Sequence, residues 1–509
     1  MSSKLKNQGI INYKIVKMSN ELKKRNNKND KYKDTIAAIS TPAGEGGIGI
    51  VRMNGPLSLS IMKKLFVPFS NGRKRNINIK ERLTEDFIPK PRYAYFGTFS
   101  DSNGDIIDDV ICIYFKEPSS YTREDMVEIQ AHGSPVSLRK ILNSLVSEGA
   151  RIAEAGEFTK LAFMNGRIDL SQAEAVMDLI SAKTDAPHGI AIKQLSGLLK
   201  LEIEEIRENL RDILARITVN IDFPDEDIEQ EEYRDLIDEL KIIKIKVDKI
   251  ASSANSGKIA KEGIKSSIIG RPNVGKSSLM NLILGEDRAI VTNIPGTTRD
   301  FIEEQVNYKG IPIVLTDTAG IRNPADEVEK IGIDRAKNYI ESSDVLILLV
   351  DGSEELSEED YKIIDMVKKA EELSRHELHI IVSINKIDIG KIIKKEKIKK
   401  LLPKAIVLET SLIKYDGAEN ILDEIEKLVS AGTVTSEMGN IITNERHKTA
   451  LIQSSLELSN AIKALEAKEP LEMVEITTHM AYDFLGEIIG ETAGEEILDA
   501  VFEKFCLGK

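Results

Sequence analysis

The chain has 509 residues, a length typical of about three domains. With 41% hydrophobic and 30% charged residues it has the composition of an ordinary globular protein. Its formal net charge of −13 excludes a protein that grips nucleic acid over its whole surface, because such a surface is basic. Two distant cysteines, Cys112 and Cys506, exclude a disulfide framework and a zinc site. Because no apolar stretch approaches the roughly 20 residues that span a bilayer, we expect a cytoplasmic protein without membrane contact.

The first 33 residues are rich in Lys, Asn and Ser and poor in acidic residues. We interpret residues 1–33 as a disordered basic tail. One alternative is a targeting peptide, although transit peptides favour Arg and an amphipathic pattern. Another is an early start codon ahead of Met18.

Residues 34–152 alternate short β-type runs with Gly, Pro and Asn, and this pattern predicts a compact α+β domain. A helix-like segment follows at Leu138–Val146, and Cys112 lies in an apolar run as a buried small residue. The β-type runs are TIAAIS, GIGIVRM, YAYFGTF and DVICIYF.

Residues 153–262 change to helical spacing, interrupted at Pro224 by an acidic segment. Residues 263–430 alternate strands and helices, which predicts a largely parallel sheet covered by helices. Residues 431–509 return to helical periodicity. We therefore expect a multidomain α/β and α+β protein whose GTPase-like domain is inserted into an all-α helical domain. The alternative is three independent domains in series.

The segment from Gly270 to Ser277 reads GRPNVGKS and matches the phosphate-binding loop G-x-x-x-x-G-K-[ST]. It follows a predicted strand and opens a predicted helix, so that backbone N–H groups and the helix N-terminus face the phosphates. Lys276 should reach the β- and γ-phosphates, and Ser277 should bind Mg²⁺.

Three further elements follow in the order that a GTPase requires. Thr298, in the segment Thr-Thr-Arg-Asp, is expected to bind Mg²⁺ and sense the γ-phosphate. Asp317, which opens Asp-Thr-Ala-Gly, should hold Mg²⁺ through water, and Gly320 N–H should bind the γ-phosphate. In Asn385-Lys-Ile-Asp388, the carboxylate can accept two hydrogen bonds from guanine that adenine cannot donate.

A backbone N–H near Ser411 should meet the guanine carbonyl, although Leu412 departs from the common Ser-Ala pair. These elements predict that the chain binds and hydrolyses GTP. The predicted GTP-binding residues are Asn273, Val274, Gly275, Lys276, Ser277, Ser278, Thr292, Thr297, Thr298, Asp317, Thr318, Ala319, Gly320, Asn385, Lys386, Asp388 and Ser411.

Hydrolysis needs a group that orients the attacking water, and Ras-type enzymes use a Gln. Here the residue after Asp-Thr-Ala-Gly is Ile321, which cannot orient water, so Glu329 is the candidate. Its alternative is a solvated helix charge. Transition-state charge needs an arginine or a bound cation, and Asn273 is a candidate ligand for a monovalent cation.

Together these motifs resemble the MnmE (TrmE) family of tRNA-modification GTPases over nearly the whole chain from Asp34. The resemblance is carried by TPAGEGGIGIVRMNG, GEFTKLAFMNGRIDLSQAEA, NIDFPDED, GRPNVGKSSLMN, GTTRD, DTAGIR followed by DEVEKIGI, and the terminal Phe505-Cys506-Leu507-Gly508-Lys509. It implies a homodimer that works in a heterotetramer with the FAD protein MnmG. This complex builds an aminomethyl or carboxymethylaminomethyl group on C5 of the wobble uridine of certain tRNAs bound within it.

The resemblance further implies an N-terminal dimerisation domain that binds 5-formyl- or 5,10-methylene-tetrahydrofolate, and hydrolysis promoted by K⁺. It places Mg²⁺ on Ser277 and Thr298, and the water-orienting acid on Glu329. Cys506 matches a cysteine suspected of taking part in the modification chemistry. The implied K⁺ ligands are Asn273, Thr292, Ile294 and Thr297, and the implied folate contacts are Arg52, Glu128, Arg167 and Lys509.

Each implied residue has a structural alternative. Arg52 and Glu128 could form a surface ion pair, Cys506 could lie in a frayed tail, and Arg167 stands where the family commonly has a lysine. At the level of function, the alternatives are a regulatory switch GTPase in ribosome assembly and a stand-alone folate-dependent one-carbon transferase.

Overall fold

A computed structural model describes most of the chain from Asp34 onward. The described ranges are 34–69, 87–222, 230–285, 303–317, 343–373, 378–413, 416–433, 442–506 and residue 508. The chain divides into two compact units: one contains the described residues up to Glu174 and from Ala493 onward, and the other is Ala175–Thr492.

The first unit is built on one mixed sheet, whose order within the described residues is β3-β4-β5-β6-β2-β1-β7. Its strands are β1 (Ile36–Ile39), β2 (Gly46–Asn54), β3 (Phe66–Pro68), β4 (Ala94–Ser100), β5 (Ile106–Phe115), β6 (Met126–Gly133) and β7 (Arg151–Ile152). The pairs are antiparallel except β1 with β7. The predicted β-type runs are confirmed as β1, β2, β4 and β5, whereas β3, β6 and β7 were not predicted.

Side chains alternate across this sheet, so its two faces differ. Val51, Ile129 and Cys112 pair across neighbouring strands and are fully buried under helices α2 (Ser58–Leu65) and α3 (Pro135–Ser147). Burial raises the pKa of the Cys112 thiol well above its usual value, as expected of an inert core cysteine. The next row along the strands turns Arg52 and Glu128 to the opposite face.

The C-terminal segment packs within this first unit. Helix α17 (Glu495–Phe502) is followed by Phe505, and both Phe502 and Phe505 are buried. Gly156 precedes helix α4 (Glu157–Met164) with φ 67°, and a Cβ there would lie 2.7 Å from Phe502 O. The frayed-tail alternative is therefore wrong for the described end of the chain.

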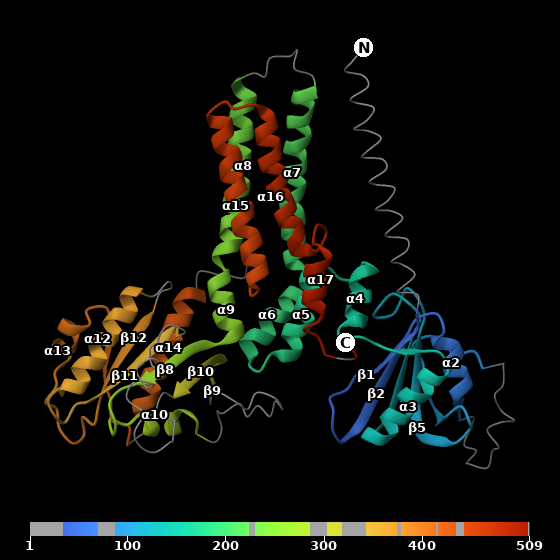
Figure 1. Ribbon diagram of the computed structural model, residues 1–509, viewed down its shortest axis with the longest axis horizontal. Coiled ribbons are helices and arrows are strands. Elements are labelled where there is room, and N and C mark those ends of the chain that lie inside the picture. The colour runs from blue at the N-terminus through green and yellow to red at the C-terminus, as the bar shows by residue number, and fades with distance from the viewer. Residues whose placement is uncertain are drawn as a thin grey trace. The chain divides into compact units, whose positions relative to one another are not determined.

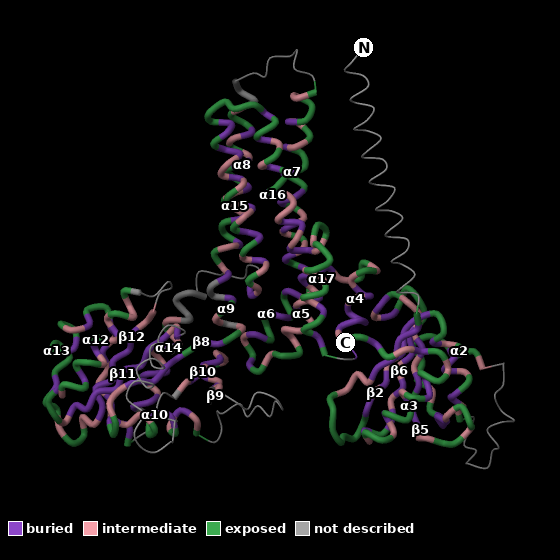
Figure 2. Tube along the Cα trace, in the orientation of Figure 1, coloured by how far each residue is buried: buried purple, intermediate pink, exposed green. Residues whose placement is uncertain are grey.

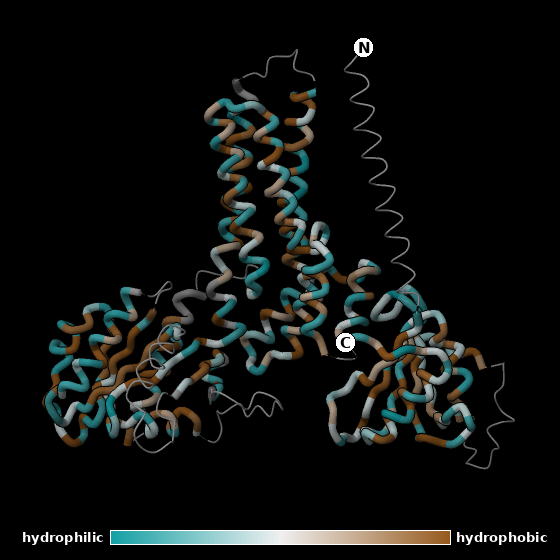
Figure 3. The backbone as a smooth tube through the Cα atoms, viewed as in Figure 1, coloured by the Kyte–Doolittle hydropathy of each residue, from teal (hydrophilic) through white to brown (hydrophobic). Residues whose placement is uncertain are grey.

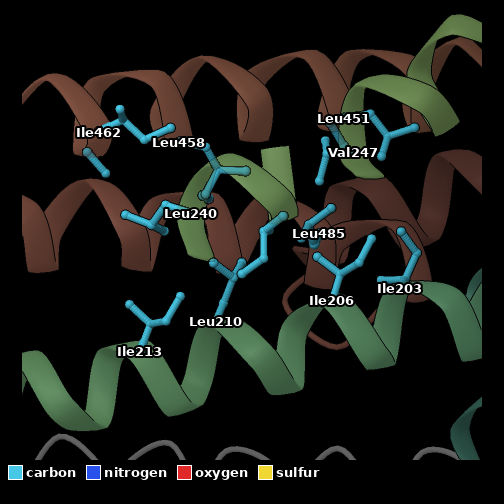
Figure 4. Close-up of a cluster of buried hydrophobic side chains, with 14 of the residues drawn as sticks. Ile203, Ile206, Leu210, Ile213, Leu240, Val247, Leu451, Leu458, Ile462 and Leu485 are labelled. Atoms are coloured by element: carbon cyan, nitrogen blue, oxygen red, sulfur yellow. The ribbon is translucent and has the colours of Figure 1, made fainter. Parts of the chain in front are cut away.

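The second unit contains a bundle of four long helices (Figure 1). They are α7 (Leu198–Asp222), α8 (Gln230–Ser252), α15 (Glu445–Glu466) and α16 (Leu471–Ile489). Apolar residues three and four positions apart place one stripe of each helix in a common core. Figure 4 shows this core, with Leu210 of α7, Leu240 of α8, Leu458 of α15 and Leu485 of α16 turned toward one another. Buried and exposed positions accordingly alternate along each helix (Figure 2).

This shared core decides how the domains are connected. Helices α7 and α8 precede the α/β domain in sequence, whereas α15 and α16 follow it, yet all four bury residues in one cluster. The α/β domain is thus inserted into the helical domain, as predicted, and the alternative of domains in series is wrong. Shorter helices complete this part of the chain: α5 (Leu170–Ser181), α6 (Asp185–Leu195) and α9 (Ala254–Glu262).

The inserted domain has a sheet of order β13-β12-β11-β8-β10-β9 within the described residues, parallel except at β9. Its strands are β8 (Ile264–Ile269), β9 (Glu303–Tyr308), β10 (Ile311–Asp317), β11 (Val345–Asp351), β12 (His379–Asn385) and β13 (Ile406–Glu409). The sequence runs IKSSIIG, IPIVLTDT, DVLILLVDG, HIIVSIN and AIVLET predict all of these strands except the edge strand β9, whose EEQVNY lacks an apolar run.

Helices cover both faces of this sheet, which explains why its central strand β11 is apolar from Val345 to Val350. Along β11, odd-numbered residues such as Ile347 pack with α10 (Lys276–Ile283) and α14 (Asp416–Thr433). Even-numbered residues such as Leu348 pack with α12 (Glu358–Leu373) and α13 (Lys395–Leu401). The buried strands show as brown stretches in Figure 3.

Among the described helices, none combines the length and hydropathy needed to cross a membrane.

Truncating a side chain in the shared core should destabilise the helical domain. Leu210 is fully buried, so Leu210→Ala leaves a cavity and should lower the free energy of unfolding by about 2–5 kcal/mol. Leu201 lies on the same helix but is 62% exposed, so Leu201→Ala should change it by less than about 0.5 kcal/mol. Urea denaturation of the full chain, followed by circular dichroism, measures both variants. Equal midpoints for the two variants would contradict this packing.

Candidate functional site

The phosphate-binding loop connects β8 to α10, and two of its glycines are required by close contacts. Gly270 has φ 150°, and a Cβ there would lie 2.6 Å from Leu349 O on the neighbouring strand β11. Gly275 has φ 108°, and its Cβ would lie 2.5 Å from Asn385 Nδ2. Val274 between them is fully buried. The loop is therefore in close contact with the sheet on one side and, on the other, with Asn385 at the start of the segment predicted to bind guanine, Asn385–Asp388.

Polar groups of this loop surround the start of α10. Ser277 and Ser278 lie exposed in its first turn, where free N–H groups favour anions. Asn273 is exposed and has φ 64°, a conformation that Asn tolerates better than most residues. Lys276 Nζ donates to Gly270 O at 2.6 Å and to Arg271 O at 2.8 Å.

The side chain of Asn385 joins the phosphate-binding loop to Leu412, next to the residue Ser411 that is predicted to meet the guanine carbonyl. Its Nδ2 donates to Val274 O at 2.8 Å, and its Oδ1 accepts from Leu412 N at 3.1 Å. Asn385 is 3% exposed, so both bonds lie away from solvent, where losing them is most costly. Three predicted motifs that are distant in sequence are therefore held together by one amide.

The carboxylate predicted to recognise guanine is held by Ser411. Ser411 Oγ donates to Asp388 Oδ1 at 2.6 Å, and Asp388 is otherwise exposed. The sequence prediction assigned this segment a main-chain contact with the base. The structure adds a role for the Ser411 hydroxyl, which fixes one oxygen of Asp388.

Arg271, inside the phosphate-binding loop, faces carboxylates of the β11–α12 connection. It pairs with Glu354, and its Nε lies 3.4 Å from Asp360 Oδ2. The hydrogen bond with Glu354 raises the pKa of Arg271. The guanidinium of Arg271 is therefore held by these carboxylates.

Several predicted residues lie outside the described part of the chain. Among the predicted Mg²⁺ ligands, Asp317 is described. It is the last residue of β10, and in the parallel pair of β10 with β8 it lies opposite Ile268. The predicted residues outside the described ranges are Thr292, Ile294, Thr297, Thr298, Thr318, Ala319, Gly320, Glu329 and Lys509. Their roles remain predictions.

A second cluster of predicted residues lies on the face of the N-terminal sheet that is opposite to α2 and α3 and that α4 packs against. Arg52 on β2 and Glu128 on β6 are cross-strand neighbours, and Arg52 Nη2 lies 2.7 Å from Glu128 Oε1. Their side chains are 18% and 16% exposed, so this is a half-buried pair rather than a fully exposed one. The guanidinium of Arg52 also lies 5.5 Å from the ring centroid of Tyr121 and 5.6 Å from that of Phe158.

Tyr121 brings Arg167 to the same cluster. The guanidinium of Arg167 lies 4.6 Å from the Tyr121 ring centroid, and its Nη1 donates to Tyr121 O at 2.8 Å. The Tyr121 hydroxyl in turn shares a 3.0 Å hydrogen bond with the buried Thr159. Arg52, Glu128 and Arg167 are thus gathered around one aromatic ring that the sequence prediction missed. A lone Tyr in the segment PSSYTRED gave no signal of this role.

The C-terminal residues lie beside the first strand of the same unit. Ser40 Oγ donates to Gly508 O at 3.0 Å. Gly508 has φ 85°, and a Cβ at this position would lie only 2.4 Å from Ile39 O. The side chain of Cys506 is exposed and is not in a disulfide. A free, exposed thiol is therefore presented beside a fixed glycine.

Comparison with protein families matches both units. Residues 35–167 match the GTP-binding protein TrmE N-terminus. Residues 170–506 match the MnmE helical domain, a span that contains the inserted α/β domain.

Relatives are similar over nearly the whole chain. A tRNA modification GTPase MnmE of Clostridioides difficile (strain 630) is 44% identical over 476 residues, which cover 94% of this chain and 99% of the relative. A second tRNA modification GTPase MnmE, from Bacillus velezensis, is 41% identical over 478 residues, or 94% of this chain and 100% of the relative. The chain belongs to the MnmE family. This confirms the family resemblance carried by the sequence motifs.

Solved structures similar to part of this MnmE-family chain include the G domain of the T. maritima FeoB iron transporter. It is 27% identical, covers 33% of this chain and 98% of its own, and has a TM-score of 0.24. A TM-score this low supports no conclusion about the MnmE-family fold.

Removing the bridging amide should uncouple the nucleotide-binding segments of this MnmE-family chain. Asn385→Ala leaves Val274 O and Leu412 N buried without their partner, at about 1–3 kcal/mol each. We expect GDP affinity to fall at least about 30-fold, the equivalent of roughly 2 kcal/mol. Isothermal titration calorimetry measures it, with Asn420→Ala, an exposed position on α14, as the matched control. Similar affinities in the two variants would show that the bridge is dispensable.

Proposed function

We propose that this chain is a GTP-hydrolysing enzyme of tRNA wobble-uridine modification. The observation that carries this proposal is the arrangement around Asn385, which joins the phosphate-binding loop to the segment beside Asp388. Membership of a family whose relatives are named tRNA modification GTPases supports the second half of the proposal.

Guanine is recognised in this proposal by Asp388. Its carboxylate accepts hydrogen bonds from guanine N1–H and the 2-amino group, while Ser411 holds the carboxylate in place. Adenine lacks this pair of donors, so it would leave the carboxylate without partners, which is a strong form of discrimination. Lys386 and the backbone near Ser411 complete the base site.

The phosphates are bound where β8 meets α10. Backbone N–H groups of the loop and the start of α10 supply favourable dipoles, and Lys276 contacts the β- and γ-phosphates. Mg²⁺ fits the donor set of Ser277, exposed in the first turn of α10, together with Thr298 and Asp317. When bound, it neutralises charge on the phosphate oxygens.

Hydrolysis depends in this proposal on groups other than glutamine or a local arginine. Glu329 orients the attacking water, since Ile321 cannot. A K⁺ ion fits the amide oxygen of Asn273, which is exposed at the rim of the phosphate-binding loop. Thr292, Ile294 and Thr297 are its remaining proposed ligands. Bound K⁺ would supply the positive charge that Arg271, paired with Glu354, does not.

The proposed modification reaction takes place with a partner. We propose a cytoplasmic homodimer that joins the FAD protein MnmG in a heterotetramer. The complex attaches an aminomethyl or carboxymethylaminomethyl group to C5 of the wobble uridine of a bound tRNA. GTP hydrolysis then drives conformational change in the complex, and Cys506 is a candidate participant in the modification chemistry.

The cluster around Tyr121 fits a tetrahydrofolate. A flat heterocycle can stack on the Tyr121 ring, the Glu128 carboxylate can accept its N–H groups, and Arg52 and Arg167 can bind its carboxylates. Lys509 is the remaining proposed contact. When bound, a 5-formyl- or 5,10-methylene-tetrahydrofolate supplies the one-carbon unit of the modification.

Deletion of the gene for this chain should remove the modification at C5 of the wobble uridine in the affected tRNAs. We expect mass spectrometry of tRNA nucleosides from the deletion strain to show loss of C5-modified wobble uridines. Expression of the intact chain from a plasmid should restore them. An unchanged pattern of C5 modification in the deletion strain would overturn the proposed function and would favour a regulatory GTPase.

The proposed cation site predicts that GTP turnover depends on the salt. With K⁺ as the monovalent cation, we expect GTP turnover at least about tenfold faster than with Na⁺. This difference corresponds to an activation free energy lower by about 1.4 kcal/mol. Asn273→Ala should remove most of this difference, because it deletes the proposed amide ligand. Phosphate release at equal ionic strength measures both proteins. Equal rates of the intact chain in the two salts would contradict a K⁺ site at Asn273.

A further inference from the structure

A buried carboxylate that belongs to none of the nucleotide-binding motifs lies behind the guanine-binding segment. Asp351 ends strand β11 and is 5% exposed. It accepts from Lys386 Nζ at 2.7 Å, from Ser353 N at 3.0 Å and from Ser353 Oγ at 2.6 Å. A charge taken this far out of water needs such partners, because desolvation otherwise opposes ionisation.

The same turn is attached to the guanine-binding segment through its backbone. Gly352 N donates to Asn385 O at 2.7 Å, and Gly352 O accepts from Ile392 N at 2.8 Å. A Cβ on Gly352 would lie 2.9 Å from Asn385 O, so the two segments are in direct contact. Lys386 has φ 64°, a conformation that is unfavourable for lysine. The ion pair with Asp351 helps to hold this residue in that conformation.

The β11–α12 connection is also tied to the phosphate-binding loop. Arg271 Nη2 lies 4.0 Å from Asp351 Oδ2, and the same guanidinium pairs with Glu354 and Asp360. Asp360 is held at the start of α12 by two reciprocal hydrogen bonds with Ser357. Ser357 N donates to Asp360 Oδ2 at 2.9 Å, and Asp360 N donates to Ser357 Oγ at 3.2 Å. The connection therefore contacts both halves of the nucleotide site.

Asp351 is ionised in this environment. Burial opposes the charged form, but the hydrogen bonds from Lys386 and Ser353 outweigh it, and the pKa of Asp351 lies below its usual value. The carboxylate therefore stays charged at neutral pH and can hold the Lys386 ammonium.

We propose that Asp351 is a positioning residue for guanine recognition. By holding Lys386 and packing the β11–α12 turn against Asn385, it fixes the segment that carries Asp388 relative to the phosphate-binding loop. This inference rests on the proposed GTP site, and it assigns the specificity of that site to a residue that does not touch the base.

The test compares two nucleotides that differ in the group recognised by Asp388. Inosine diphosphate lacks the 2-amino group of GDP, so the ratio of the two dissociation constants reports how well Asp388 is placed. In the full chain, Asp351→Asn should weaken GDP binding at least about tenfold, as expected for losing a charged hydrogen bond. It should also reduce the preference for GDP over inosine diphosphate at least about threefold.

Matched variants separate positioning from general stability. Asp344→Asn changes an aspartate at the other end of β11, where Asp344 accepts from Lys265 N at 2.9 Å, and should leave the GDP preference unchanged. Ser353→Ala removes one donor to Asp351 without unpairing the charge and should reduce the preference in the same direction but less. It serves as the test if Asp351→Asn does not fold.

A double-mutant cycle then tests the link to Lys386. Asp351→Asn combined with Lys386→Met should bind GDP within about twofold of Lys386→Met alone, because the pair acts as one unit. An intact GDP preference in both Asp351→Asn and Ser353→Ala overturns the inference while leaving the proposed function in place. Failure of the unaltered chain to bind GDP overturns the proposed function itself.

Discussion

The nucleotide-binding domain depends on one buried amide. Asn385 satisfies a carbonyl of the phosphate-binding loop and an N–H of the segment after β13, so each of its hydrogen-bonding groups has a fixed partner. Buried polar groups without partners cost more than the bonds themselves contribute, so the three segments are held in one arrangement. The glycine at 275 follows from this arrangement, since a side chain there would overlap the amide.

Around this amide, charged groups perform separable tasks. Asp388 presents a carboxylate that Ser411 fixes, whereas Asp351 accepts a hydrogen bond from the ammonium of Lys386. Arg271 is neutralised by the carboxylates of the β11–α12 connection. In the proposed function, Asp388 recognises the base by hydrogen bonding, while ions and residues beyond the loop serve the phosphate chemistry.

The insertion of this domain into the helical bundle has a mechanical consequence. Because α8 leads into the inserted domain through α9, and α15 follows it, both connections enter a bundle that has a single core. The two chain connections to the inserted domain therefore come from two helices, α8 and α15, that share this core. In the other unit, the C-terminal segment contacts residues from the start of the described chain, as Ser40 Oγ donates to Gly508 O across 468 positions of sequence.

The sequence by itself determined the elements whose chemistry is local. The phosphate-binding loop is recognisable because its glycines and its Lys276 must follow one another. The strands β10, β11 and β12 are recognisable because burial on both faces favours mostly apolar runs, such as VLILLV in β11. The helices were also predicted from burial, because apolar residues that recur with a period of 3.6 residues form one buried stripe on a helix. The edge strand β9 escaped because it needs no such run.

Only the tertiary structure decided which distant residues meet. Nothing local marks Tyr121 as the ring between Arg52 and Arg167, or Asp351 as the partner of Lys386, because any surface tyrosine or aspartate has the same sequence signal. The packing of α7 and α8 with α15 and α16 likewise depends on side chains separated by the whole inserted domain. Periodicity states which face of an element is buried, but only three-dimensional packing selects the partner that covers it.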